Sequence, residues 1–267
     1  MARIFITGSA DGLGRLAARR LVEAGHEVVL HARNRGRARD ALQAVPGARQ
    51  ALVGDLASIA EVRDLAEQAN GAGPFDAVIH NAGVGYQEAR QDTVDGLEHV
   101  FAINVLAPYL LSALIQRPRR LIYLSSGMHR GGRPDLADLQ WRRRSWNGSQ
   151  AYSDSKLHDV VLAFAIAGRW PGVLSNAVDP GWVPTRMGGR GAPDDLEQGA
   201  ETQAWLAVGD DPGARVSGRY FFHRHRRETN PAASDLEVQD GLLRACQELT
   251  GVAIGPEPPS GEAGPPP

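Results

Sequence analysis

The stretch RIFITGSADGLGRLAARRL, residues 3–21, runs from a short apolar segment through a glycine-rich turn into a segment of helical periodicity. Gly8, Gly12 and Gly14 lie in this turn. A backbone without side chains lets a pyrophosphate approach the unpaired N–H groups and the positive dipole end of the following helix. The spacing T-G-x-x-x-G-x-G differs from the general dinucleotide fingerprint G-x-G-x-x-G. The stretch therefore predicts a nucleotide-binding turn, with a ligand-free tight turn as the alternative.

Similar apolar runs recur along the chain, as expected for strands buried in a parallel sheet. Segments of helical period separate them, the first ending at Gly25 and the second beginning behind Ser58, an N-cap residue with Glu61 three positions later. This alternation predicts an α/β fold, a single Rossmann-type doubly wound parallel sheet with helices on both faces. The expected strands are residues 3–6, 27–30, 49–53, 75–80 and 120–124, with two later strands inside 172–180 and 217–223.

Length and composition favour one domain with a full-sized core. The chain has 267 residues, of which 42% are apolar, and a formal net charge of -2. We expect residues 1–251 to form a dinucleotide-binding catalytic domain and residues 252–267, rich in Pro and Gly, to form a disordered tail. The near-neutral charge argues against nucleic acid or an anionic membrane as a partner.

Cysteine, leader and histidine patterns predict a cytoplasmic protein without a metal. The single cysteine, Cys246, excludes an intramolecular disulfide, and its amphipathic flanks suggest a buried helix position. The opening residues lead straight into a strand pattern, and no apolar run reaches the length of about 18 residues that a membrane helix needs. His223 and His225 lack a third ligand at metal spacing.

The end of the second expected strand, VVLHARNRGRARD at residues 28–40, bears on the choice of cofactor. An acidic residue there binds the adenosine ribose of NAD, whereas an arginine accommodates the 2′-phosphate of NADP. Ala32 stands at the acidic position and Arg33 follows, so we expect NADP, with NAD the lesser candidate. Asp55, after the third strand, could accept a hydrogen bond from the adenine amino group or cap the next turn.

A tyrosine and the single lysine of the chain stand four residues apart in AYSDSKLHDV, residues 151–160. Residues at this spacing share one face of a helix. An ammonium close to a phenol favours the phenolate and lowers the tyrosine pKa from its ordinary value of about 10, toward the range of a general acid or base. The alternative interpretation is that the lysine has no catalytic role and is present by chance in a chain that otherwise uses arginine.

Seven segments in this order resemble the short-chain dehydrogenase/reductase family, and the resemblance covers nearly all of residues 1–251. In pattern it is closest to the branch of retinol dehydrogenases and protochlorophyllide reductases. The family implies hydride transfer between a nicotinamide cofactor and an alcohol or carbonyl. The segments are TGSADGLG (7–14), GDL (54–56), NAGVG (81–85), FAINVLAPYLL (101–111), LIYLSS (121–126), YSDSK (152–156) and PGWVPTRM (180–187).

The resemblance implies four catalytic residues, Asn104, Ser126, Tyr152 and Lys156. Tyr152 would exchange a proton with the reacting oxygen, and Ser126 would polarise that oxygen. Lys156 would bind the cofactor ribose, and Asn104 would hold a water that links the lysine to solvent. Either Ser125 or Ser126 could be the catalytic serine, and we favour Ser126 because the second serine has that role in members written SS.

The resemblance also implies a cofactor-binding surface built from the loops that follow the strands. Asn81 would brace the glycine-rich turn, Pro180 and Gly181 would form a wall beside the nicotinamide, and Val183 and Thr185 would bind its carboxamide. The full expected set is Gly8, Ser9, Asp11, Gly12, Leu13, Gly14, Arg33, Asp55, Leu56, Asn81, Ala82, Gly83, Tyr152, Lys156, Pro180, Gly181, Val183 and Thr185.

The segment between Ser126 and Tyr152 is longer than in typical members of the family. Its Trp141 and Trp146 could rim the substrate pocket or pack on the long helices. Many relatives associate through the helices that carry Asn104 and Tyr152. The long segment could obstruct that surface, so we expect a monomer or a weak homodimer.

These patterns together predict an NADP-dependent oxidoreductase that reduces a ketone or aldehyde, or runs the reverse reaction, on a small-molecule carbonyl or alcohol substrate. A non-catalytic NAD(P)-binding redox-sensing regulator of the same fold is the alternative, although a sensor has no need of a proton relay. A nucleotide-sugar epimerase or dehydratase would need a larger C-terminal domain. The loop after Thr185 is expected to be a mobile lid, and its composition leaves the substrate open.

Overall fold

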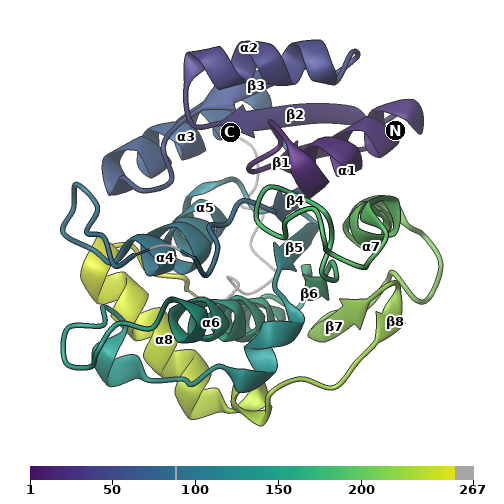
Figure 1. Ribbon diagram of the computed structural model, residues 1–267. Coiled ribbons are helices and arrows are strands. Elements are labelled where there is room, and N and C mark those ends of the chain that lie inside the picture. The colour runs from purple at the N-terminus through teal and green to yellow at the C-terminus, as the bar shows by residue number, and fades with distance from the viewer. Residues whose placement is uncertain (88, 256–267) are drawn as a thin grey trace, which may run out of the picture.

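The apolar runs form the strands of one sheet, seen between its helices in Figure 1. The computed structural model of the protein describes residues 1–87 and 89–255. The strands are β1 (Arg3–Ile6), β2 (Glu27–Ala32), β3 (Gln50–Val53), β4 (Ala77–His80), β5 (Arg120–Leu124), β6 (Leu174–Asp179), β7 (Arg219–Phe222) and β8 (His225–Arg226). Their order is β3-β2-β1-β4-β5-β6-β7-β8, parallel from β1 to β7, with β8 antiparallel at the edge.

Helices connect the parallel strands, as right-handed crossovers require. The helices are α1 (Gly12–Glu23), α2 (Arg35–Ala44), α3 (Ile59–Ala72), α4 (His99–Phe101), α5 (Ala107–Leu114), α6 (Gly148–Arg169), α7 (Leu196–Val208) and α8 (Leu236–Thr250), with a π-helical turn at Ala102–Leu106 and short 3-10 helices at Gly127–Gly131, Leu136–Asp138 and Pro231–Ser234.

Both faces of the sheet are apolar and both are covered. Successive side chains of a strand point to opposite faces. In β1, Ile4 and Ile6 pack into a core with α1, α2 and α7, whereas Phe5 packs into a second core with α3, α5 and α6. Figure 1 shows the two helix layers. The predicted doubly wound parallel sheet is confirmed.

Local signals in the sequence set the ends of several elements. The Ser58 hydroxyl accepts a hydrogen bond from the Glu61 N–H at 3.4 Å and caps α3, as predicted. Gly25 has a φ of +80° just after α1, a conformation that favours glycine. The sequence did not predict β8, which is only two residues long and so carries no measurable alternation.

The C-terminal helix α8 packs against α6, which itself packs against β5 and β6. Leu242 and Cys246 are fully buried in the same apolar core as Leu157 and Val161 of α6. Cys246 therefore occupies the buried helical position that its flanks predict. As a result, the outer face of α6 is covered by the chain itself.

Residues after α8 extend this cover across the neighbouring helices. The Tyr109 hydroxyl of α5 donates a hydrogen bond to the Val252 carbonyl at 2.6 Å, and the Trp170 indole N–H donates to the Gly255 carbonyl at 2.7 Å. Ile254, which lies between Val252 and Gly255 in the sequence, is buried. Residues 252–255 of the predicted tail thus pack on the core, and residues 256–267 lie outside the described part of the chain.

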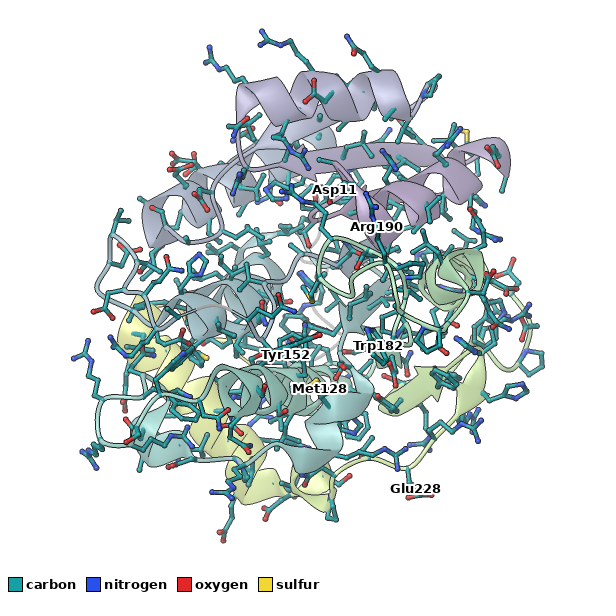
Figure 2. The ribbon with its side chains drawn as sticks, viewed as in Figure 1. Asp11, Met128, Tyr152, Trp182, Arg190 and Glu228 are labelled. Carbon is teal, nitrogen blue, oxygen red and sulfur yellow. The ribbon has the colours of Figure 1, made fainter. Side chains whose placement is uncertain are left out.

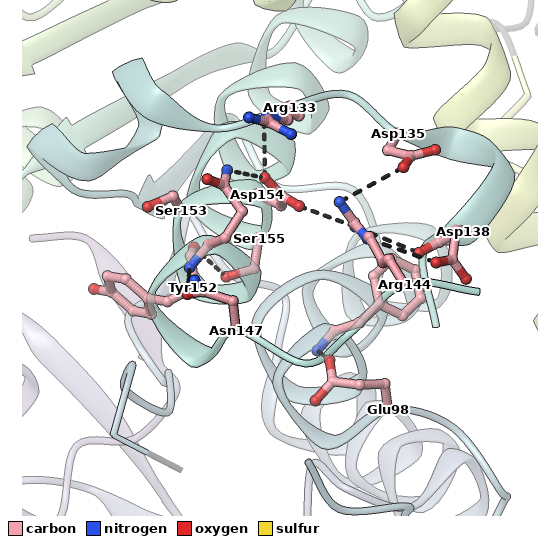
Figure 3. Close-up of polar contacts among 12 residues, drawn as sticks. Glu98, Arg133, Asp135, Asp138, Arg144, Asn147, Tyr152, Ser153, Asp154 and Ser155 are labelled. Carbon is pink, nitrogen blue, oxygen red and sulfur yellow. Dashed lines mark hydrogen bonds and ion pairs between the residues drawn. The ribbon is translucent and has the colours of Figure 1, made fainter. Parts of the chain in front are cut away.

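The long segment before α6 is anchored to that helix by Arg144 (Figure 3). Its guanidinium forms ion pairs with Asp135 at 3.5 Å, Asp138 at 3.6 Å and Asp154 at 3.1 Å, and lies 3.6 Å above the ring of Trp141. Asp154 belongs to α6, so this cluster fixes the segment against the helix surface.

Trp141 is buried in this cluster rather than at a substrate opening. It lines a small cavity together with Phe101 of α4 and with Ala151 and His158 of α6. Its ring also contacts that of Trp146, edge to face, with 5.4 Å between centroids. Of the two interpretations that the sequence allows for these tryptophans, packing on the long helices is the one that the structure supports.

Candidate active site

The glycine-rich turn between β1 and α1 lies directly against the loop that follows β4. Gly8 has a φ of +61°, and a Cβ atom there would lie 2.8 Å from the Cα of Ala82, so only glycine permits this approach. The Asn81 amide donates hydrogen bonds to the carbonyls of Thr7 at 3.0 Å and Gly8 at 3.1 Å. Asn81 therefore ties the two loops together.

The first turn of α1 is available to an anion. Asp11 stands at the N-cap position but makes no side-chain capping hydrogen bond. The N–H groups of the following turn, which includes Leu13, consequently keep their capacity to bind a phosphate. This cradle fits the pyrophosphate of a dinucleotide.

His31 in β2 connects the same turn to the third strand. Its Nδ1 accepts a hydrogen bond from the Gly8 N–H at 2.9 Å, and its Nε2 lies 2.9 Å from the Gly54 carbonyl. Because Nδ1 accepts a hydrogen bond, it carries no proton, and the single ring proton is on Nε2. The ring is therefore neutral. Burial lowers the pKa of His31 to about 4. A charged ring would lose the bond that holds Gly8.

Charged side chains gather where the adenosine half of a dinucleotide would lie. Asp11 forms an ion pair with Arg37 of α2, and Arg33 is exposed directly after β2. Asp55 accepts a hydrogen bond from the Ala57 N–H at 3.0 Å. Asp55 thus makes the capping bond, and its role toward adenine stays a prediction.

Of the expected cofactor-binding residues, Ser9, Leu56 and Val183 have buried side chains that lie within the protein. The Ser9 hydroxyl donates to the Ile6 carbonyl and accepts from the His31 N–H, both at 2.9 Å. Leu56 packs in the core and Val183 is also buried. These residues could reach a cofactor only through their backbone.

Tyr152 and Ser126 lie together at the carboxyl end of the sheet. Ser126 follows β5, and Tyr152 lies in the second turn of α6. Burial raises the pKa of Tyr152 above its ordinary value, and the nearby Lys156 ammonium and Ser126 hydroxyl oppose that rise. The expectation of a lowered tyrosine pKa is therefore corrected, because desolvation of the phenol outweighs the cation.

The two neighbouring serines differ in what they contact. The Ser125 hydroxyl is buried and donates to the Lys156 backbone carbonyl at 2.7 Å. Ser126 is partly exposed, and its hydroxyl accepts from the Met128 N–H at 3.2 Å. Ser125 thus holds α6 to the end of β5, and Ser126 is the serine that faces the phenol of Tyr152.

Lys156 is buried, and two partners accept hydrogen bonds from its ammonium. Its Nζ donates to the Leu124 carbonyl at 2.8 Å and forms an ion pair with Asp159 at 2.8 Å. The same nitrogen lies 5.7 Å from the centre of the Tyr152 ring. The sequence argument missed Asp159, although its position three residues after Lys156 puts it on the same helix face.

Asn104 belongs to the π-helical turn and lies close to Lys156 of α6. Its carboxamide accepts from the Val84 N–H at 2.8 Å and donates to the Val84 carbonyl at 3.1 Å and the Ser155 hydroxyl at 2.9 Å. A Cβ on Gly83 would lie 3.3 Å from Asn104 Oδ1 and 3.4 Å from Lys156 Nζ. The loop after β4 is thus held against both side chains, and the water-holding role of Asn104 stays a prediction.

The segment after β6 crosses over this site. A Cβ on Gly12 would lie 3.6 Å from the Thr185 methyl, and one on Gly85 would lie 2.8 Å from Met187 Cγ. The segment therefore touches the glycine-rich turn at one point and the loop after β4 at another. It begins at Pro180 and Gly181, whose N–H donates to Asp179 at 2.9 Å.

The Tyr152 ring has an aromatic neighbour, and two large apolar side chains are exposed on the face seen in Figure 2. The ring of Tyr86 meets that of Tyr152 edge to face, with 5.8 Å between centroids. Met128 and Trp182 are 36% and 57% exposed, unusually open for residues of their size. These residues offer an apolar surface to a substrate.

The described residues contain neither a metal-binding cluster nor a membrane-spanning helix. Within residues 1–87 and 89–255, no group of three or more His, Cys, Asp or Glu side chains could hold a metal ion. Over the same part of the chain, no helix is both long and apolar enough to span a bilayer.

The sequence is similar to known oxidoreductases over almost its whole length. A family model described as short chain dehydrogenase matches residues 2–125. An uncharacterized oxidoreductase of Emericella nidulans is 47% identical, over 95% of this chain and 99% of the relative. A short-chain dehydrogenase of Penicillium rubens is 44% identical over the same shares. The chain belongs to the short-chain dehydrogenase family.

More distant relatives agree with the predicted branch and fold. Human retinol dehydrogenase 13 is 29% identical over 93% of this chain and 84% of its own. A crystal structure of an uncharacterized protein from Mycobacterium Paratuberculosis matches 95% of this chain and 94% of that chain, with a TM-score of 0.81 and 26% identity. This short-chain dehydrogenase binds a nicotinamide cofactor and acts on CH–OH or C=O groups.

The neutral state of His31 gives a pH prediction. Its folded pKa of about 4 lies below the ordinary 6.5, so the unfolded state binds more protons between these values, and stability is lost as the pH falls from 6.5 to 4. We expect His31→Gln to reduce the slope of unfolding free energy against pH by up to ~1.4 kcal/mol per pH unit in this window, in urea titrations. His225→Gln, on an exposed strand, is the control and should leave the slope unchanged. An unaltered slope in His31→Gln would contradict a neutral His31.

Proposed function

We propose that this short-chain dehydrogenase is an NADP(H)-dependent reductase of ketones or aldehydes, able to run the reverse oxidation. The observation that carries the proposal is the convergence of Ser126, Tyr152 and Lys156 beside the cradle formed by Gly8 and Asn81. A redox sensor would need the cradle alone. The buried lysine, which is costly to keep in the interior, supports catalysis instead.

In the proposed reaction the bound cofactor supplies the hydride. Tyr152 donates its phenolic proton to the substrate oxygen, and the Ser126 hydroxyl donates a hydrogen bond to the same atom. The charge on Lys156 stabilises the phenolate that remains. The protonated phenol is the form that carbonyl reduction requires, and the phenolate is the form that the reverse oxidation requires.

Tyr86 beside Tyr152, together with the exposed Met128 and Trp182, supports an apolar or aromatic carbonyl substrate. Tyr86, Met128 and Trp182 contribute little that could bind a charged group. Retinol, in the name of the human relative, is likewise an apolar alcohol. A panel of aliphatic and aromatic ketones and aldehydes, assayed by loss of NADPH absorbance, would identify the class.

Removal of one phenolic oxygen tests the catalytic role of Tyr152. We expect Tyr152→Phe to lower turnover by about a hundredfold or more while cofactor affinity stays within a few-fold, because the phenol acts on the reacting oxygen. Tyr109→Phe, in the helix layer and bonded to Val252, is the matched control and should keep full turnover. Turnover in Tyr152→Phe above about a hundredth of the parent would show that another group transfers the proton.

Arg33 tests the cofactor preference. We expect the parent protein to bind NADPH at least about tenfold more tightly than NADH, because an arginine after β2 can pair with the 2′-phosphate. Arg33→Asp should remove most of this difference in fluorescence titrations, whereas Arg39→Asp, an exposed change further along α2, should not. Equal affinities in the parent would argue for NAD.

The covered face of α6 supports a monomer or a weak homodimer. Leu242 and Cys246 pack in one core with α6, and residues 252–255 bond to Tyr109 of α5 and to Trp170 after α6. We infer that they cover the surface through which many relatives associate. We expect light scattering at micromolar concentration to give the mass of one chain, or of a dimer that dissociates on dilution. A stable tetramer would contradict this.

A cytoplasmic location also remains a prediction from the sequence.

A further inference from the structure

Lys156 and Asp159 form an ion pair that is closed off from solvent. Their side chains are 5% and 3% exposed, and Nζ lies 2.8 Å from Asp159 Oδ2. Both residues project from one face of α6 toward β5, where the Leu124 carbonyl takes a second hydrogen bond from Nζ at 2.8 Å. The ammonium is thus held between a carboxylate and a backbone carbonyl.

A chain of buried polar groups lies near the ion pair. Tyr123 of β5 feels the charge of Asp159, and its hydroxyl lies 2.6 Å from that of Ser112 in α5. Ser112 in turn lies 3.0 Å from the Nε2 of His80 in β4. These groups are buried, and burial holds the pKa of His80 at about 3, so the imidazole is neutral.

The remaining ionisable neighbours lie on the substrate side. Tyr152, one turn before Lys156 on α6, feels the charges of Lys156 and Asp159. Asp179, at the end of β6, also acts on Tyr152. Asp159 is therefore the carboxylate that contacts the lysine directly.

We propose that Asp159 is a positioning residue that keeps Lys156 charged and aimed in the interior, and so sets the proton affinity of the Tyr152–Lys156 pair. The proposal rests on the catalytic roles proposed above. It follows from the geometry, because a lysine moved out of water loses its proton unless a partner stabilises the cation. Leu124 offers a dipole, whereas Asp159 offers a full charge.

The same argument fixes the direction of the effect. A carboxylate beside the pair opposes loss of a proton, whether the proton leaves the ammonium or the phenol. Replacement of Asp159 by Asn keeps a hydrogen-bond acceptor of the same shape and removes the charge. The first proton of the pair should then leave at lower pH.

The single lysine of the chain makes this directly measurable. Protein labelled with 13C at lysine Cε gives one lysine signal, and its chemical shift reports whether Nζ is protonated. We expect Asp159→Asn to lower the midpoint of this signal by about one pH unit or more. Asp154→Asn, a buried carboxylate of the same helix paired with Arg144, is the matched control and should leave the midpoint unchanged. Midpoints in the parent and Asp159→Asn that agree within about 0.3 unit would overturn the proposal.

The parent protein provides a second measurement if Asp159→Asn does not fold. Burial raises the pKa of Asp159 to about 6. The lysine signal of the parent should therefore move as Asp159 takes up a proton on the acid side of neutrality. A lysine signal at the chemical shift of a neutral amine at about pH 7 would overturn the proposal that the ion pair keeps Lys156 charged.

Kinetics give a further readout and separate the two proposals. With any substrate found in the panel, the alkaline limb of reduction should move to lower pH in Asp159→Asn by about one unit, through kcat more than KM. The lysine signal needs no turnover. A shifted midpoint together with an active Tyr152→Phe would leave the ion pair standing and defeat the proposed catalysis. An unshifted midpoint with an inactive Tyr152→Phe would defeat only the role of Asp159.

Discussion

The close approach of two backbones, at Gly8 and Ala82, is the constraint on which the site depends. It brings the turn that would hold a pyrophosphate to the loop that Asn104 holds beside Lys156. Asn81 locks the contact from one side and His31 from the other. A larger residue at Gly8 would push these loops apart, and the cradle and the catalytic side chains would no longer belong to one site.

Sequence reasoning predicted what depends on local pattern. The strands, the caps at Ser58 and Gly25 and the doubly wound sheet follow from periodicity and from single residues with known preferences. The family motifs located the candidate catalytic positions. What the sequence could not predict depends on burial, which is a property of the assembled fold. The raised pKa of Tyr152 and the pairing of Asp159 with Lys156 arise because helix α6 is covered on all sides.

That cover comes from the chain itself. Helix α8 packs against α6, the residues after it bond to α5 and to Trp170, and the segment around Arg144 covers a further part of α6. Within this chain alone the side chains of Lys156 and Asp159 are 5% and 3% exposed, so the cover that the chain provides already excludes most water from the ion pair.

The position of α8 also shapes how the protein is made. The apolar face of α6 is synthesised well before the residues that cover it, since Leu242 and Cys246 follow the whole sheet in the sequence. A nascent chain on the ribosome thus carries a bare hydrophobic helix until its last helix emerges. Such surfaces attract chaperones and other unfinished chains. The yield of folded protein then depends on how soon α8 is synthesised and packs against α6.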